Sequence, residues 1–182
     1  AIVVNDRMET SVPDIYAAGD AVQVKNSVTG DDALISLAGP ANKQGRIIAD
    51  NICGLDSRYK GSQGSSVIKV FDMTAALTGI NERTAKTAGL NADTVILSPM
   101  SHAGYYPGGK VMTVKVVFEK GTYRLLGAQI VGYDGVDKRI DVLATAIRAG
   151  MKATDLKDLD LAYAPPYSSA KDPVNMAGFM ID

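Results

Sequence analysis

Tryptophan is absent from the chain, and cysteine and histidine occur once each, as Cys53 and His102. A single cysteine excludes an internal disulfide, a Cys-x-x-Cys redox pair and a thiolate zinc site, and we expect no metal centre. Cys53 lies at the end of an expected helix, beside Ile52. We therefore expect its thiol to be buried and unreactive.

An excess of charge is missing as well. The 182 residues include 19 Lys and Arg against 20 Asp and Glu, which gives a formal net charge of −1 and a pI near 5.8. Without a basic field, nucleic acid is not expected to be the main partner. No apolar run approaches the roughly 18 residues of a membrane span, and no secretory signal pattern opens the chain. These absences predict a cytoplasmic protein with no membrane partner.

What remains is ordinary globular sequence. With 46% hydrophobic and 21% charged residues, the chain can build one medium domain, or one domain with an appendage. Residues 61–66 are small, polar and flexible, and they form the best candidate boundary. We therefore expect two parts, residues 1–62 and residues 63–182.

The residue order of one run, Thr10–Ala21, is hard to explain by folding alone. Pro13 fixes a turn, residues 15–18 are expected to form a short apolar strand, and Gly19 and Asp20 close it. A strand that ends in small residues, a Gly that admits close approach and a carboxylate can together accept a polyhydroxyl chain. An ordinary strand ending in a Gly-Asp turn would show the same pattern, and from these residues alone both interpretations stay open.

The run resembles the second FAD-binding motif of the pyridine nucleotide-disulfide oxidoreductases, T-S-x-P-x-I-Y-A-x-G-D. The resemblance implies that Asp20, beside Gly19, hydrogen-bonds the ribityl chain of the flavin. Residues 37–46, L-A-G-P-A-N-K-Q-G-R, are similar to the family's next motif, L-A-x-x-A-x-x-Q-G-R. It opens a helix, expected here from Pro40 to Ile52, whose amino-terminal N–H groups and dipole favour a flavin carbonyl and a reduced flavin. The implied contacts at that helix start are Pro40, Ala41 and Asn42.

Three further features of this family are missing: the opening G-x-G-x-x-G, the redox-active cysteine and the nicotinamide-binding unit. The chain opens in what resembles the middle of a strand, at residues 1–5, with no initiator Met. We therefore expect it to be the carboxyl-terminal part of a longer flavoenzyme, inactive by itself. The resemblance does not distinguish NADH from NADPH, and it leaves open whether a rhodanese domain follows.

The second part alternates strands and helices. The expected strands are residues 67–71, 93–97, 111–119 and 123–131, with a short extended link at 77–80. The expected helices are residues 82–88, capped by Asn81, and 136–149, followed by a short amphipathic turn at 174–179. Residues 111–119 place Met112, Val114, Val116 and Phe118 on one face. Residues 136–149 place Val136, Ile140, Leu143 and Ile147 on one apolar face of the expected helix.

This order of elements resembles the dimerisation domain of the same family, an α+β unit in which an antiparallel sheet with flanking helices pairs with its twin. The resemblance implies a homodimer. Residues 135–141 are similar to the family's G-x-D-K-R-I-D segment, which opens the interface helix. From charge spacing alone, a solvated helix face is the simpler interpretation of that segment.

Four of the eight tyrosines lie in two loops made rigid by Pro. Tyr105 and Tyr106 lie in residues 101–109, and Tyr163 and Tyr167 lie in residues 162–168. Phenols on such loops can donate a proton or hydrogen bond to a sulfur leaving group. For any single one of them, packing of the ring with the hydroxyl tied to a backbone carbonyl is the simpler interpretation.

The carboxyl-terminal stretch indicates which members of the family the chain resembles. It lacks the His-Pro acid/base dyad of glutathione reductase, and residues 163–178 look like those of the coenzyme A-disulfide reductases and their persulfide-reductase relatives. The resemblance implies that Tyr105 and Tyr163, offered across the dimer, hydrogen-bond the active-site thiolate or the departing coenzyme A sulfur. Tyr106 and Tyr167 are the second choices. His102 is expected to be structural, with a pocket role still open.

The parent enzyme is thus expected to use FAD and NAD(P)H to reduce coenzyme A disulfide or coenzyme A persulfide. Two alternatives remain. An NADH oxidase or peroxidase of the same superfamily would share the flavin motifs, although those enzymes usually end in Trp-containing runs. The second alternative is a dimerisation module without catalytic activity.

Overall fold

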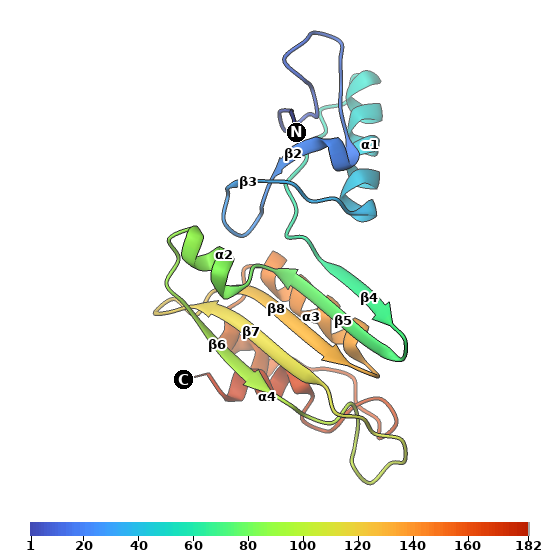
Figure 1. Ribbon diagram of the computed structural model, residues 1–182, viewed down its shortest axis with the longest axis vertical. Helices are drawn as coiled ribbons and strands as arrows, with labels where there is room; N and C mark the ends of the chain where they lie inside the picture. Colours follow the sequence, from blue (N-terminus) through green and yellow to red (C-terminus); the bar gives the residue numbers. More distant parts are fainter. Residues whose placement is uncertain (182) are drawn as a thin grey trace. The chain divides into compact units, whose positions relative to one another are not determined.

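The computed structural model describes residues 1–181, and its chain forms two compact units, Ala1–Gly64 and Ser65–Asp182 (Figure 1). We predicted the break between residues 62 and 63, and the structure has it between residues 64 and 65. The assignment of the two units to domains of a flavoenzyme stays a prediction at this point.

The first unit is a small sheet covered by one helix. Strand β2 (Val22–Lys25) pairs in parallel with β1 (Ile2–Val3) and antiparallel with β3 (Asp32–Ala33). The single turn of 3-10 helix η1 (Gly19–Ala21) precedes β2, and helix α1 (Ala38–Ile52) follows β3. The buried side chains of this unit's core are Met8, Val22 and Val24, with Ile47 and Ile48 of α1 packed against them.

The prediction of a strand at residues 15–18 is wrong. Only Tyr16 pairs with the facing segment, through an isolated bridge to Glu9. The facing segment cannot continue as a strand because Met8 adopts a positive φ of 68°. The chain therefore runs through the bridge directly into η1, which carries Gly19 and Asp20.

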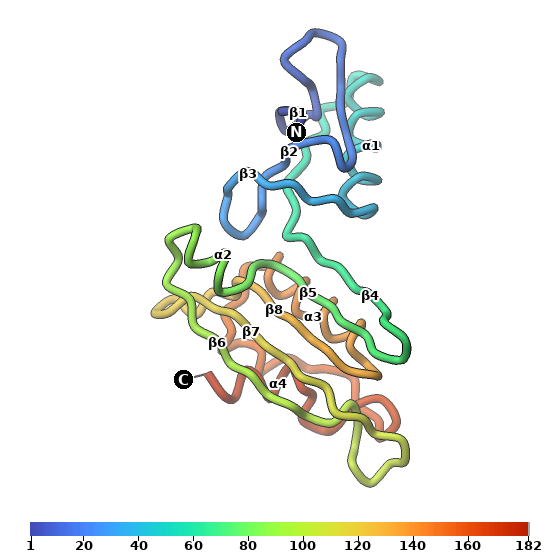
Figure 2. Tube along the Cα trace, viewed as in Figure 1, coloured from blue at the N-terminus to red at the C-terminus, as the bar shows by residue number. Residues whose placement is uncertain are grey.

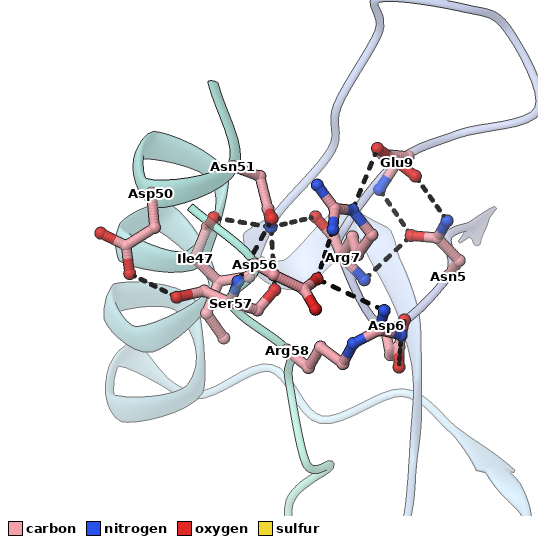
Figure 3. Close-up of polar contacts among 10 residues, drawn as sticks. All are labelled: Asn5, Asp6, Arg7, Glu9, Ile47, Asp50, Asn51, Asp56, Ser57 and Arg58. Carbon is pink, nitrogen blue, oxygen red and sulfur yellow. Dashed lines mark hydrogen bonds and ion pairs between the residues drawn. The ribbon is translucent and has the colours of Figure 1, made fainter. Parts of the chain in front are cut away.

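Cys53 is exposed, which contradicts the buried thiol that we expected. The reason is that Asn51, not Ile52, occupies the inward-facing position of the last turn of α1. The Asn51 amide donates to the carbonyl oxygens of Arg7 (3.3 Å), Ile47 (2.9 Å) and Ser57 (2.9 Å), as Figure 3 shows. Since successive helical residues are about 100° apart, Ile52 and Cys53 turn toward solvent.

The second unit is a five-stranded antiparallel sheet with the order β4-β5-β8-β7-β6. Its strands are β4 (Ser66–Val70), β5 (Met73–Gly79), β6 (Ala92–Leu97), β7 (Thr113–Glu119) and β8 (Leu125–Gly132). Its helices are α2 (Glu82–Thr87), α3 (Val136–Arg148), the 3-10 helix η2 (Ala153–Asp158) and α4 (Pro173–Phe179). The α+β class with flanking helices, expected from the sequence, is confirmed.

A short extended link was expected at residues 77–80, but residues 77–79 are instead the end of the seven-residue strand β5. Its earlier residues, such as Thr74 and Ala75, are weakly hydrophobic and give no clear strand signal. Strand β5 forms because it pairs along its length with β4 on one side and β8 on the other. Tertiary pairing thus decides the structure of this segment.

The core of the second unit lies between the sheet and α3, which packs against β8 and β5. The predicted inward face of the β7 segment is confirmed, because Met112, Val114, Val116 and Phe118 are all buried. The predicted apolar face of α3 is confirmed as well, and its buried members are Val136, Ile140, Leu143 and Ile147.

The predicted N-cap of α2 is confirmed, because the Asn81 side chain accepts a hydrogen bond from the Thr84 N–H at 2.9 Å.

Neither Gly79 nor Gly127 leaves room for a side chain where β5 passes β8. A Cβ atom on Gly127 would lie 1.9 Å from the carbonyl oxygen of Ile80, and Gly79 has a φ of +69°. The close approach lets the Ile80 N–H donate to the Leu126 carbonyl oxygen at 2.9 Å. The sheet therefore requires glycine at both positions.

None of the helices within residues 1–181 is long and apolar enough to cross a membrane. The same residues contain no group of three or more His, Cys, Asp or Glu side chains that could hold a metal ion.

Replacing Gly127 by Ala should lower the free energy of unfolding by about 1–3 kcal/mol, because the new methyl group must displace backbone. Urea denaturation followed by circular dichroism measures the change. Gly104→Ala is the control, since a Cβ atom there meets no atom within 4 Å. Equal stability of the two variants would contradict the close packing of β5 against β8.

Candidate functional site

Two loops of the second unit carry the four tyrosines singled out in the sequence. The first connects β6 to β7, and the second leads from η2 to α4 (Figure 1). The Ala103 N–H of the first loop donates to the Ser168 carbonyl oxygen of the second at 2.9 Å, and Figure 2 shows the two traces side by side. Tyr105 and Tyr163, which are 58 residues apart in the chain, thus come together.

The hydroxyl groups of Tyr105 and Tyr163 form a hydrogen bond of 2.7 Å. Both side chains are open to solvent, with 76% of Tyr105 and 45% of Tyr163 exposed. The hydrogen bond with Tyr105, more than the slight desolvation, raises the pKa of Tyr163 above its usual value of 10.0. Tyr163 therefore keeps its phenolic proton, and so a hydrogen-bond donor, at neutral pH.

The second-choice tyrosines lie differently. The ring of Tyr106 packs edge-on against His102, with 5.5 Å between ring centroids. Tyr167 accepts a hydrogen bond from Lys138 Nζ at 2.8 Å through its backbone carbonyl, and its side chain is exposed. The structure thus brings together Tyr105 and Tyr163 and leaves Tyr106 and Tyr167 outside this pair.

His102 lies buried beneath the first loop. Its Nδ1 atom is 3.2 Å from the Ala103 carbonyl oxygen, and a Cβ atom on Gly109 would approach its ring to 3.3 Å. Together with the edge contact to Tyr106, this position favours the packing role expected from the sequence.

Arg139 is the residue that sequence reasoning missed. Its side chain is only 1% exposed, although charge spacing favoured a solvated helix face. A signal was present: Arg139 lies three residues after Val136 and one before Ile140, within the apolar stripe of α3. A charged residue on an inward-facing stripe indicates a buried ionic partner.

That partner is Asp172. Arg139 Nε lies 3.2 and 3.1 Å from the two carboxylate oxygens, and Nη2 lies 3.0 Å from Oδ2. The Ser168 hydroxyl donates to the same Oδ2 atom at 2.6 Å, and Asp172 also caps α4 by accepting from the Val174 N–H at 2.9 Å. Burial alone would raise the pKa of Asp172, but the hydrogen bonds from Ser168 and Val174 and the Arg139 guanidinium outweigh it and lower that pKa.

The first unit places the other candidates at the start of α1. The Gly19 N–H donates to the buried Gln44 Oε1 at 2.7 Å, and a Cβ atom on Gly19 would lie 4.0 Å from the Ala41 Cβ. This contact holds η1, and with it the exposed Asp20, against the first turns of the helix. Gln44 was part of the motif, but its positioning role was not foreseen.

The amino-terminal end of α1 has no side-chain cap, because Leu37 occupies the N-cap position. Pro40 has no N–H group and the Ala41 N–H donates to the Leu37 carbonyl oxygen at 3.2 Å, so the open N–H groups are those of Ala38 and Gly39. Asn42 is exposed one turn into the helix. A carboxylate and a helix start with open N–H groups lie together here. They suit a polyhydroxyl chain joined to an electron-rich ring.

Comparison with known proteins places this fold in a family. Residues 65–173 match the family described as pyridine nucleotide-disulphide oxidoreductase, dimerisation domain. Among curated proteins, the coenzyme A disulfide reductase of Staphylococcus epidermidis is 38% identical over 179 residues. That match covers 98% of this chain and 40% of the relative, so the chain spans about two-fifths of its length.

The fold is also similar to that of several solved structures. The reduced CoADR-RHD of Bacillus anthracis is 53% identical with a TM-score of 0.95, over 99% of this chain and 32% of that one. A NAD-dependent persulfide reductase from A. fulgidus is 48% identical with a TM-score of 0.95, over 99% and 33%. A water-forming NADH oxidase from Lactobacillus brevis is 30% identical with a TM-score of 0.93, over 99% and 40%.

Replacing Tyr105 by Phe removes the main cause of the raised Tyr163 pKa. We expect that pKa to fall toward its usual value of 10.0, so that Tyr163 loses its proton at a lower pH than in the unsubstituted chain. NMR titration of isotope-labelled tyrosine measures it. Tyr133→Phe, at an exposed tyrosine outside both loops, is the control. A Tyr163 titration that does not respond to the loss of the Tyr105 hydroxyl would show that the two are unpaired in solution.

Proposed function

The chain belongs to the pyridine nucleotide-disulphide oxidoreductase family through its dimerisation domain, and from this we propose that it is the carboxyl-terminal part of an FAD-dependent NAD(P)H oxidoreductase. We propose coenzyme A disulfide or coenzyme A persulfide as its substrate. By itself the chain would not turn over, because it supplies only part of the flavin site, the dimer interface and the tyrosines. The cytoplasmic location expected from the sequence is part of the same proposal.

The observation that carries the proposal is the hydrogen-bonded pair of exposed hydroxyls on Tyr105 and Tyr163. Reduction of a disulfide forms a new S–S bond between the attacking thiolate and one substrate sulfur. The original S–S bond breaks, and the other coenzyme A sulfur leaves as a thiolate. A phenol that keeps its proton can donate a hydrogen bond to that thiolate and so lower the barrier to its departure.

The first unit contributes to the flavin site. Asp20, exposed on η1, would accept a hydrogen bond from a hydroxyl of the ribityl chain, and Gly19 leaves room for its approach. The uncapped start of α1, at Pro40, Ala41 and Asn42, would face the pyrimidine end of the ring and stabilise negative charge there. When bound, the flavin would carry electrons from NAD(P)H toward the thiol that attacks the substrate.

Exposed apolar surface supports a homodimer or further domains around the second unit. The hairpin of β4 and β5 leaves six large apolar side chains exposed: Val67, Ile68, Val70, Phe71, Met73 and Leu77. Patches of this kind mark interaction surfaces in soluble proteins. In a homodimer the open tyrosine pair would be offered to the active site of the partner subunit.

An NADH oxidase or peroxidase of the same superfamily is the second candidate, favoured by the structural likeness to the Lactobacillus brevis oxidase. Thiol-dependent and oxygen-dependent consumption of NADH by the longer enzyme would separate the two. A dimerisation module without activity is the remaining alternative, and a catalytic domain encoded ahead of this segment would exclude it.

In the longer enzyme, replacing both Tyr105 and Tyr163 by Phe should lower reduction of coenzyme A disulfide by at least about tenfold, since general acid catalysis by one group contributes about 10²–10⁴-fold. Steady-state rates with the disulfide as the varied substrate measure the effect. Tyr133→Phe should retain the rate of the unsubstituted enzyme. Unchanged turnover in the double variant would remove the tyrosines from the mechanism.

The oligomeric state of the 182-residue chain tests whether the interface is autonomous. We expect a dimer, because the matched family domain is a dimerisation domain and the exposed β4–β5 surface needs a partner. Light scattering after gel filtration measures the mass. A monomer would mean that other domains are needed for the interface, and would leave the transfer of Tyr105 and Tyr163 across it without support.

A further inference from the structure

The guanidinium of Arg139 connects three separate segments of the second unit. Nη1 donates to the Gly135 carbonyl oxygen at 2.9 Å, at the start of its own helix. Nη2 donates to the Ser101 carbonyl oxygen at 2.9 Å and to Ser168 Oγ at 3.2 Å. Ser101 opens the loop of Tyr105, and Ser168 closes the loop of Tyr163, so one buried side chain holds both loops.

The groups around Arg139 fit a guanidinium. Gly135 has a φ of +67°, and a Cβ atom there would lie 2.3 Å from Arg139 Nη1. The carboxylate of Asp172 balances the charge, and it is itself buried and fixed by Ser168 and Val174. A lysine has a single ammonium group, so it could keep the ion pair with Asp172 but could not reach both loops at once.

The contact points lie close to the tyrosines along the chain. Ser101 is four residues before Tyr105, and Ser168 is five residues after Tyr163. Such short segments transmit a shift of either anchor to the hydroxyl at the loop tip. The hydroxyl contact of 2.7 Å tolerates little movement, because hydrogen bonds weaken rapidly beyond their normal range.

We propose that Arg139 is a positioning residue, which holds the two loops in register so that the hydroxyls of Tyr105 and Tyr163 meet. Asp172 and Ser168 act with it, the first by neutralising the guanidinium and the second by joining it to the second loop. The importance of this role for catalysis rests on the proposed function. The positioning itself does not, because it can be measured without any substrate.

Arg139→Lys in the full 182-residue chain tests the positioning. The substitution keeps a positive charge for Asp172 and removes the link to Ser101. We expect a chain that still folds, judged by circular dichroism, in which the pKa of Tyr163 returns toward its usual value of 10.0 because the hydroxyl pair has separated. NMR titration of isotope-labelled tyrosine provides the measurement. A folded variant with the unsubstituted Tyr163 titration would overturn the proposal.

Two further variants sharpen the result. Arg148→Lys makes the same exchange at an exposed arginine in the last turn of α3, and it should leave the Tyr163 titration unchanged. Ser168→Ala keeps both charges and removes only the hydroxyl that joins them to the second loop. It decides the question if Arg139→Lys does not fold: a lowered Tyr163 pKa supports the positioning role, and an unchanged one overturns it.

Turnover by the longer enzyme separates this inference from the proposed function. Arg139→Lys should lower the rate with coenzyme A disulfide, but it should lower it no further in an enzyme that already lacks both hydroxyls, because the two changes act through one group. A rate loss that adds fully to that of the Tyr105→Phe, Tyr163→Phe enzyme would show a general structural role instead. If the tyrosines prove irrelevant to turnover while Arg139→Lys still releases Tyr163, only the proposed function fails.

Discussion

A buried guanidinium must have a partner for its charge and acceptors for its N–H groups, and this requirement organises one end of the second unit. Arg139 meets it with Asp172, Ser168 and the carbonyl oxygens of Gly135 and Ser101. Loss of one member of such a pair leaves an uncompensated buried charge, which typically destabilises a protein by about 3–5 kcal/mol. The helix, both tyrosine loops and the cap of α4 therefore depend on the same cluster.

The regular elements were largely predictable because they follow local periodicity. The alternation around Val114 and the stripe from Val136 to Ile147 predicted β7 and α3 correctly. Segments that depend on their neighbours were not predictable: β5 forms through pairing on both sides, and the bridge at Tyr16 stays short because Met8 bends the facing segment. The burial of Cys53 was wrongly predicted because Asn51, a polar residue, takes the inward-facing position at this end of α1.

For the candidate site, the sequence indicated which tyrosines to compare but not that two hydroxyls would meet. Motif resemblance selected Tyr105 and Tyr163, which are separated by four elements of the second unit, β7, β8, α3 and η2. The two loops are joined by the Ala103–Ser168 backbone bond and by the contacts of Arg139 with Ser101 and Ser168. The stripe of α3 indicates that Arg139 is buried, but no local pattern shows which loops it reaches. The same holds for Gly19 and Gln44, which come together only when α1 folds beside η1.

Asp172 also makes this end of the fold cooperative. One carboxylate accepts from the first turn of α4, from the Ser168 hydroxyl and from the guanidinium, so a single proton would disturb all three. Because its pKa lies below the usual 3.8, this stabilisation is fully present above that pH and is lost only as the pH falls through the lowered pKa. Acid would therefore loosen the end of the second unit that carries both tyrosine loops as one block, in a single protonation event.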